Sequence, residues 1–141
     1  MKKVFKRVTA LIMATLMLGS IISATAASNR ASDYFDSYYF SFKMLGSGNM
    51  RITYGVFGTE TMSKIGVSKI WIEEEVGPND WVTVDTRGSS YTYNNMDHLA
   101  SFDYGGSVYS VYRVGMTAYA QNSYGSETKT YYSEPVTCKT K

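Results

Sequence analysis

The feature that most constrains the fold is the longest two-residue alternation of the chain, between residues 108 and 120, in which one set of side chains is mainly small and apolar. In a β-strand, successive side chains point to opposite faces of the sheet, so a period of two predicts a strand with one buried face. The alternation divides residues 108–120 into two sets of side chains, and we expect the set with small apolar side chains to face the core. That set is Tyr112, Val114, Met116, Ala118 and Ala120.

The same alternation recurs along most of the chain between turn signals. All 13 Tyr and both Trp lie beyond residue 26, and aromatic side chains favour pleated, half-buried surfaces. No window in this part sustains an apolar period of 3.6, so the sequence predicts an all-β domain and an irregular connection over residues 95–106. The expected strands cover residues 37–44, 50–56, 65–76, 81–86, 91–94, 108–120 and 128–139.

The first 26 residues have the organisation of a secretory signal peptide. Residues 1–7 are basic, residues 8–22 are apolar, and Ala24 and Ala26 form a cleavage site. The apolar stretch is shorter than the roughly 20 residues that a transmembrane helix needs. We therefore expect a cleaved signal-peptide helix (1–26), a flexible polar leader (27–36), a β-domain (37–141) and a secreted product.

Cleavage would reverse the net charge. The chain has 14 basic and 12 acidic residues, and four of the basic ones lie in the first seven positions. Their removal leaves 10 against 12, a net charge of about −2 with His neutral, and no Lys/Arg cluster. The mature chain thus lacks the basic patch that nucleic acid or an anionic membrane surface would require. It also has no second apolar span, so we expect no integral membrane segment.

Cys138 is the only cysteine, so no intramolecular disulfide can form. An unpaired cysteine in a secreted chain leaves open a dimer linked through Cys138. About 115 residues are enough for one domain whose stability comes from packing.

Seven short strands separated by turns predict a two-sheet antiparallel sandwich, because each sheet must bury one apolar face against the other. The segment with Tyr112, the alternating apolar set, Asn122 and Gly125, followed by Ser133, Pro135 and Val136, resembles the last two strands of fibronectin type III domains. The resemblance implies a seven-stranded fibronectin type III-like, immunoglobulin-like β-sandwich. The layout also resembles small secreted bacterial proteins, which implies no activity.

The inventory of reactive side chains gives little support for catalysis. His98 is the only histidine and is expected on a surface loop, far from Cys138, and no Gly-x-Ser-x-Gly elbow is present. Glu73 and Glu75 share one strand face, a spacing compatible with glycosidase chemistry or a cation site, but a charge run at a strand end is typically solvated. We expect no catalytic residues, no metal site and no cofactor.

The two tryptophans are the most informative candidates for binding. Trp71 points away from Ile70 and Ile72, and Trp81 shares its face with Thr83 and Asp85, opposite Val82 and Val84. In the fibronectin-like topology these strands lie beside residues 108–120, which present Arg113 and Tyr119 outward. The predicted ligand-binding residues are therefore Trp71, Trp81, Arg113 and Tyr119.

We accordingly expect a secreted, non-catalytic interaction or adhesion module that binds an extracellular or cell-surface partner through an aromatic sheet face. One alternative is a polysaccharide-binding module that uses the same aromatics to stack on sugar rings. A less favoured alternative is a small secreted hydrolase that uses Glu73 and Glu75, or His98.

Overall fold

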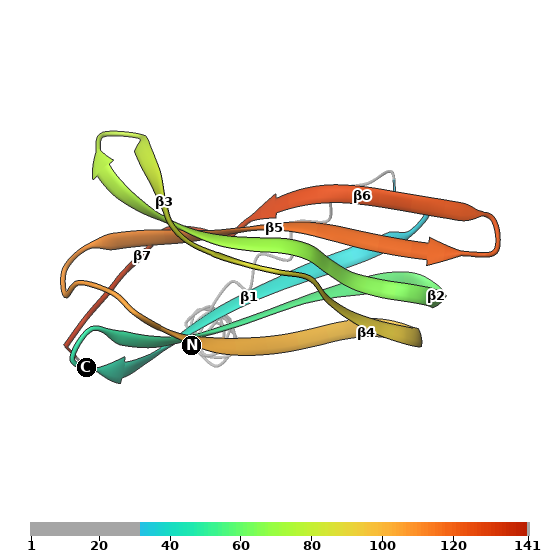
Figure 1. The fold of residues 1–141 in the computed structure, drawn as a ribbon, viewed down its shortest axis with the longest axis horizontal. Coiled ribbons are helices and arrows are strands. Elements are labelled where there is room, and N and C mark those ends of the chain that lie inside the picture. Colours follow the sequence, from blue (N-terminus) through green and yellow to red (C-terminus); the bar gives the residue numbers. More distant parts are fainter. Residues whose placement is uncertain (1–31, 141) are drawn as a thin grey trace, which may run out of the picture.

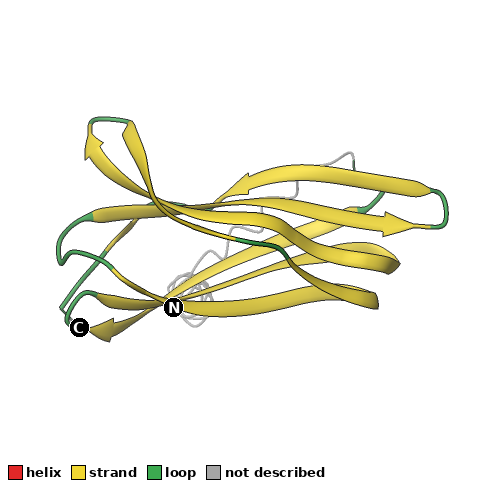
Figure 2. Ribbon diagram, in the orientation of Figure 1, coloured by secondary structure: helices red, strands yellow, loops and turns green. Residues whose placement is uncertain are grey.

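The computed structural model describes residues 32–140, which form an all-β fold without a helix (Figure 2). Within this range no helix therefore qualifies as a membrane span. The predicted signal peptide, its cleavage site at Ala24 and Ala26, and the first part of the polar leader lie outside the described residues.

Seven strands are hydrogen-bonded into one continuous antiparallel sheet (Figure 1). Their bounds are β1 Phe35–Gly46, β2 Asn49–Gly77, β3 Asp80–Arg87, β4 Ser90–Gly105, β5 Val111–Asn122, β6 Gly125–Tyr132 and β7 Val136–Thr137. The turns after β1 and β2 are where the sequence predicts them. Ser47 and Asn79 adopt left-handed conformations there, with φ of 53° and 57°.

The long strand β2 has different neighbours in its two halves. Residues 49–57 lie between β1 and the second half of β4, whereas residues 70–74 lie between β3 and β5. Strand β6 then pairs with β5 and forms one edge of this second portion, and β7 pairs with the start of β5. Figure 1 shows the two groups of strands diverging along the molecule.

Both halves of β2 bury one face in a single apolar core. Ile52 and Val56 from the first half and Ile70 and Ile72 from the second are at most 1% exposed. The predicted core face of β5, from Tyr112 to Ala120, is also at most 1% exposed at every second position, so that prediction is confirmed. Burial of each large apolar side chain contributes roughly 1.5–3 kcal/mol to folding.

Several predicted boundaries are wrong. The strand expected over residues 108–120 begins only at Val111, and the one expected over residues 128–139 is divided into β6 and β7. Residues 95–105 of the expected irregular connection belong to the continuous strand β4, and the expected break between the strands at 50–56 and 65–76 lies inside β2. A register shift between Phe57 and Met62 and a positive φ of 51° at Asn94 accommodate these polar, glycine-containing stretches as irregularities within strands. Strand β1 begins at Phe35, within the predicted leader.

The Cys138 thiol is inaccessible in this fold. It is 0% exposed and donates to the Gly48 carbonyl at 3.2 Å, and burial raises its pKa. A dimer linked through Cys138 is therefore unsupported, because a thiolate must be exposed to exchange or oxidise.

Candidate functional site

The predicted aromatic residues converge on the outer face of the second sheet portion, formed by β3, the second half of β2, β5 and β6. Two rows of directly opposed residues define the site. Trp71 lies opposite Gly115, which lies opposite Tyr132 on β6. In the next row, Glu73 lies opposite Arg113. Opposed residues in an antiparallel pair project from the same face, so these side chains meet above the sheet.

The indole ring of Trp71 packs across the neighbouring strand β5. Its neighbours Ile70 and Ile72 are buried, so alternation turns the indole outward as predicted. The ring lies over Gly115, where a Cβ atom would overlap it. Its Nε1–H donates to Glu73 Oε1 at 3.2 Å, and the Tyr132 ring meets it edge-on at a centroid distance of 5.7 Å. Glycine at position 115 is therefore a condition for this placement.

Arg113 is enclosed by aromatic rings and one carboxylate. Its guanidinium carbon lies 4.3 Å from the Trp81 ring centroid and 4.8 Å from that of Tyr132. Its Nε donates to Glu73 Oε2 at 2.5 Å. The side chains of Arg113 and Glu73 are 28% and 12% exposed, so the ion pair is partly desolvated. We call Trp71, Glu73, Trp81, Arg113 and Tyr132 the aromatic ladder.

A bulge in β3 changes the predicted face of one residue. Trp81 and Thr83 lie opposite Glu75 and Glu73, but Val84 is skipped in the register, and Asp85 lies opposite the buried Ile72. The prediction that Asp85 shares a face with Trp81 is therefore wrong, since an extra residue inverts the alternation.

The two valines of β3 do not pack into the core. Val82 and Val84 are 47% and 39% exposed. Figure 1 shows the reason: the β2–β3 hairpin projects away from the other strands, so its inner side meets no second layer.

Tyr119 lies on the same face as the ladder but outside it. It is four residues along β5 from Gly115, a separation of about 13 Å. It belongs to a second cluster, in which the Lys64 ammonium lies 4.0 Å from the Tyr91 ring centroid and 5.3 Å from that of Tyr119. The structure thus brings together three of the four predicted binding residues.

Sequence reasoning missed two members of the site. Tyr132 lies on the edge strand β6, whose face the sequence did not assign, and it is 44% exposed. Gly115 carried a usable signal, because a glycine inside a strand often marks a close approach by another group.

The residues considered for catalysis are not assembled for it. The two carboxylate oxygens of Glu73 accept hydrogen bonds from Trp71 and Arg113. Glu75 accepts a hydrogen bond from the backbone N–H of Asn79 at 3.4 Å. Cys138 contacts Gly48, whereas His98 pairs with Val56, about 26 Å further along the strands. Within residues 32–140, no group of three His, Cys, Asp or Glu side chains is arranged to bind a metal ion.

His98 is buried in β4, which corrects its predicted place on a surface loop. It is 5% exposed, and its Nδ1 lies 2.9 Å from the Thr92 hydroxyl. Its Nε2 has no hydrogen-bond partner among the described residues. Burial lowers the pKa of His98, and the nearby Asp97 carboxylate opposes this effect. Loss of solvation is the dominant cause, so the neutral ring is favoured.

No known family model matches this chain, and no curated protein sequence matches it.

Proposed function

We propose that the protein is a secreted, non-catalytic interaction module that binds an extracellular protein through the aromatic ladder. Its exported state is inferred from the leader sequence. The observation that carries the proposal is the enclosure of Arg113 between Trp81 and Tyr132, on a sheet face that points away from the core. Tryptophan, tyrosine and arginine are the residues that most often dominate protein interfaces.

The enclosure makes the ladder rigid before a partner arrives. The Glu73 ion pair and the two ring contacts hold the guanidinium, and the Glu73 carboxylate also holds the Trp71 indole. Side chains that are already ordered lose less entropy on binding, so more of the contact energy appears as affinity.

The exposed parts of the ladder define the chemistry of the partner. Tyr132 presents an aromatic surface, and the Arg113 Nη groups form no hydrogen bond within residues 32–140. We expect the partner to place an apolar or aromatic side chain on Tyr132 and a carbonyl or carboxylate oxygen against Arg113.

A protein ligand is favoured over a polysaccharide by the orientation of the tryptophans. Sugar stacking needs an open ring face, but one face of each indole is already occupied, that of Trp81 by Arg113 and that of Trp71 by the backbone of Gly115. The polysaccharide-binding alternative would depend chiefly on Tyr132.

We also propose that the fold is a fibronectin type III-like β-sandwich. Two features support this. Residues 49–57 of β2 pair with β1 and β4, residues 70–74 pair with β3 and β5, and both ends of β2 contribute buried residues to the same core. The sandwich would place the ladder on the outer face of one layer.

Site-specific photo-cross-linking tests the proposed interface. A photoreactive phenylalanine analogue at Tyr132 should capture a discrete surface or secreted protein from the producing culture, and Trp81→Ala should abolish the product. The same analogue at Tyr124, which is 89% exposed in the β5–β6 turn, is the matched control. Equal yields at both positions, or a product unaffected by Trp81→Ala in a folded variant, would refute the proposal.

A further inference from the structure

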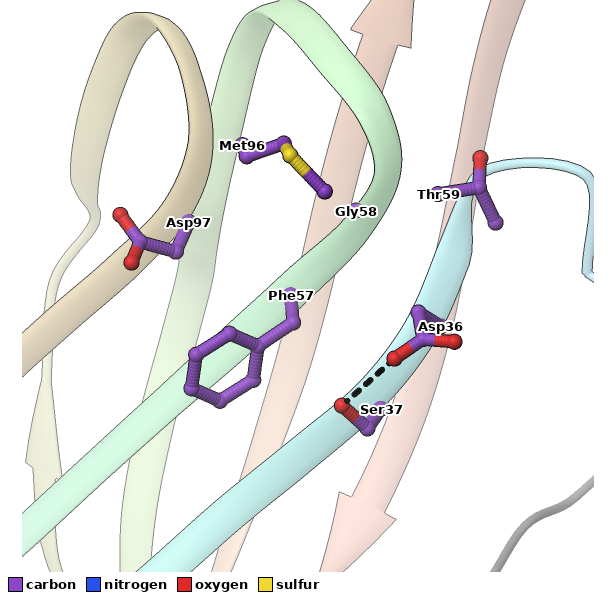
Figure 3. A pocket seen from close by; sticks show the side chains of 7 residues that line it. All are labelled: Asp36, Ser37, Phe57, Gly58, Thr59, Met96 and Asp97. Atoms are coloured by element: carbon purple, nitrogen blue, oxygen red, sulfur yellow. Dashed lines mark hydrogen bonds between the residues drawn. The ribbon is translucent and has the colours of Figure 1, made fainter.

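A cleft of about 550 Å³ opens at the end of the first sheet portion, away from the ladder residues (Figure 3). Strands β1, β2 and β4 each contribute to its lining. The lining residues are Asp36, Ser37, Phe57, Gly58, Thr59, Met96 and Asp97.

Strand register explains how the cleft is built. Ser37, Phe57 and Asp97 form one row across β1, β2 and β4, so the Phe57 ring has a hydroxyl on one side and a carboxylate on the other. In Figure 3, the Phe57 ring and Asp97 lie on one side of the cleft, and Asp36 lies on the other. Met96, which is 53% exposed, stands between the strands at the mouth.

An apolar surface continues from the cleft along the same face. The next row is Tyr39, Gly55 and Leu99, two residues further along the strands and therefore about 6.6 Å away. Tyr39 and Leu99 are 44% and 51% exposed. Contiguous exposed apolar side chains with a polar rim are typical of interaction surfaces.

The charge of the cleft has one sign. Asp36 and Asp97 line it, and no Lys or Arg is among the lining residues. Within residues 32–140 neither carboxylate forms an ion pair, whereas four other carboxylates do so elsewhere. Asp36 accepts only a hydrogen bond from the adjacent Ser37 hydroxyl, at 3.2 Å.

We propose that this cleft receives a lysine or arginine side chain from an extended segment of a protein partner. The aliphatic stem would pack on Met96 and Phe57, and the cationic head would lie near the Phe57 ring and between the carboxylates of Asp36 and Asp97. In an extended segment, residues two apart lie about 6.6–6.8 Å from one another on the same side. An apolar residue two positions from the cation would therefore reach Tyr39 and Leu99.

The proposal is independent of the aromatic ladder. It uses the first half of β2 with β1 and β4, and none of its residues contacts the ladder. Loss of ladder binding would leave this inference standing, and failure of cleft binding would leave the proposed function standing.

A capped peptide of sequence Leu-Ser-Lys-Ser-Leu is the probe, and amide chemical shifts of the labelled protein are the readout. We expect saturable shifts at Gly58, Thr59 and Leu99, with affinity in the millimolar to high micromolar range. Replacing the peptide's lysine with norleucine keeps the stem and removes the charge. That change should weaken binding roughly tenfold, because a partly desolvated cation gains both ion-pair and ring contacts.

Asp97→Asn should weaken binding of the lysine peptide by a similar factor. Glu134→Gln, an equal charge change at an exposed position outside the cleft, should leave it unaltered. If Asp97→Asn impairs folding, Asp36→Asn replaces it, because Asp36 is exposed at the cleft rim. Absence of saturable shifts, equal affinity for the norleucine peptide, or unchanged binding to both Asn variants would overturn the proposal.

Discussion

The two portions of the sheet share strand β2, but the charged side chains of the aromatic ladder form an ion pair and those of the cleft do not. In the aromatic ladder, Arg113 is paired with Glu73 and enclosed by two rings. In the cleft, Asp36 and Asp97 have no cationic partner within the described residues. Charged groups that pair with one another stabilise the sheet that holds them. Charged groups without a partner can instead form their ion pairs with a ligand.

This difference separates stability from binding. Substitutions in the ladder should destabilise the fold as well as remove a contact surface, because its residues depend on one another. Substitutions of the cleft carboxylates should leave stability nearly unaltered and affect only the capture of a cation.

Gly115→Ala should give the largest loss. Its Cβ would overlap the Trp71 indole, so the ring must move and lose its contacts with Glu73 and Tyr132. Overpacking of this kind costs about 2 kcal/mol, equivalent to a fall in Tm of roughly 10 °C for a domain of this size. Thermal unfolding followed by tryptophan fluorescence measures it.

Gly88→Ala is the matched control for that change. A Cβ at Gly88 meets nothing within 4 Å, so its Tm should stay within about 3 °C of the parent protein. Equal Tm values for the two variants would show that Trp71 does not depend on Gly115.

Glu73→Gln and Asp97→Asn make the same chemical change in the two portions. Glu73→Gln removes a partly buried charge opposite Arg113 and should cost about 1–2 kcal/mol. Asp97→Asn removes an unpaired charge and should stay within about 0.5 kcal/mol. Urea unfolding at pH 7 measures both free energies of unfolding. Similar losses in the two variants would erase the distinction between the portions.

Mild acid should lower the free energy of unfolding through His98, which lies in the first portion of the sheet. Burial lowers its folded pKa below the ordinary value of 6.5, so the unfolded chain binds the proton first as pH falls. Stability from this group is complete above pH 6.5 and declines as pH drops through 6.5 toward the lowered folded pKa. His98→Gln should remove that part of the decline between pH 7 and 5. Superimposable pH profiles of stability for the two proteins would contradict this assignment.

The β-sheet content and the buried face of β5 could be predicted from sequence because both follow from alternation alone. In a strand every second side chain points to the same face, so the sequence order alone places Tyr112, Val114, Met116, Ala118 and Ala120 on one face of β5. The outward direction of Trp71 follows in the same way from its neighbours Ile70 and Ile72.

The errors arose where an extra residue or a distant strand decides the outcome. The skipped Val84 inverts the face of Asp85, and no local pattern locates a bulge of this kind. Polar residues near Asn94 resemble a loop, yet pairing with β2 holds them in β4 and buries His98. Tyr132 joins the ladder only through the register of β6 with β5, which is a property of the assembled sheet.

The smallest expected change in stability comes from Lys69, whose side chain lies beside the ladder residue Trp71. The Lys69 ammonium lies 5.5 Å from the Trp71 ring centroid, and an exposed cation–π contact contributes about 0.5 kcal/mol. Lys69→Met keeps most of the stem, so its loss in unfolding free energy should be about that size. Lys43→Met, an exposed lysine of β1 for which no cation–π contact exists in residues 32–140, should change stability by less. Because Trp71 is already fixed by Gly115, Glu73 and Tyr132, a larger loss at Lys69 would mean that the cation, rather than the glycine and the carboxylate, holds the indole in place.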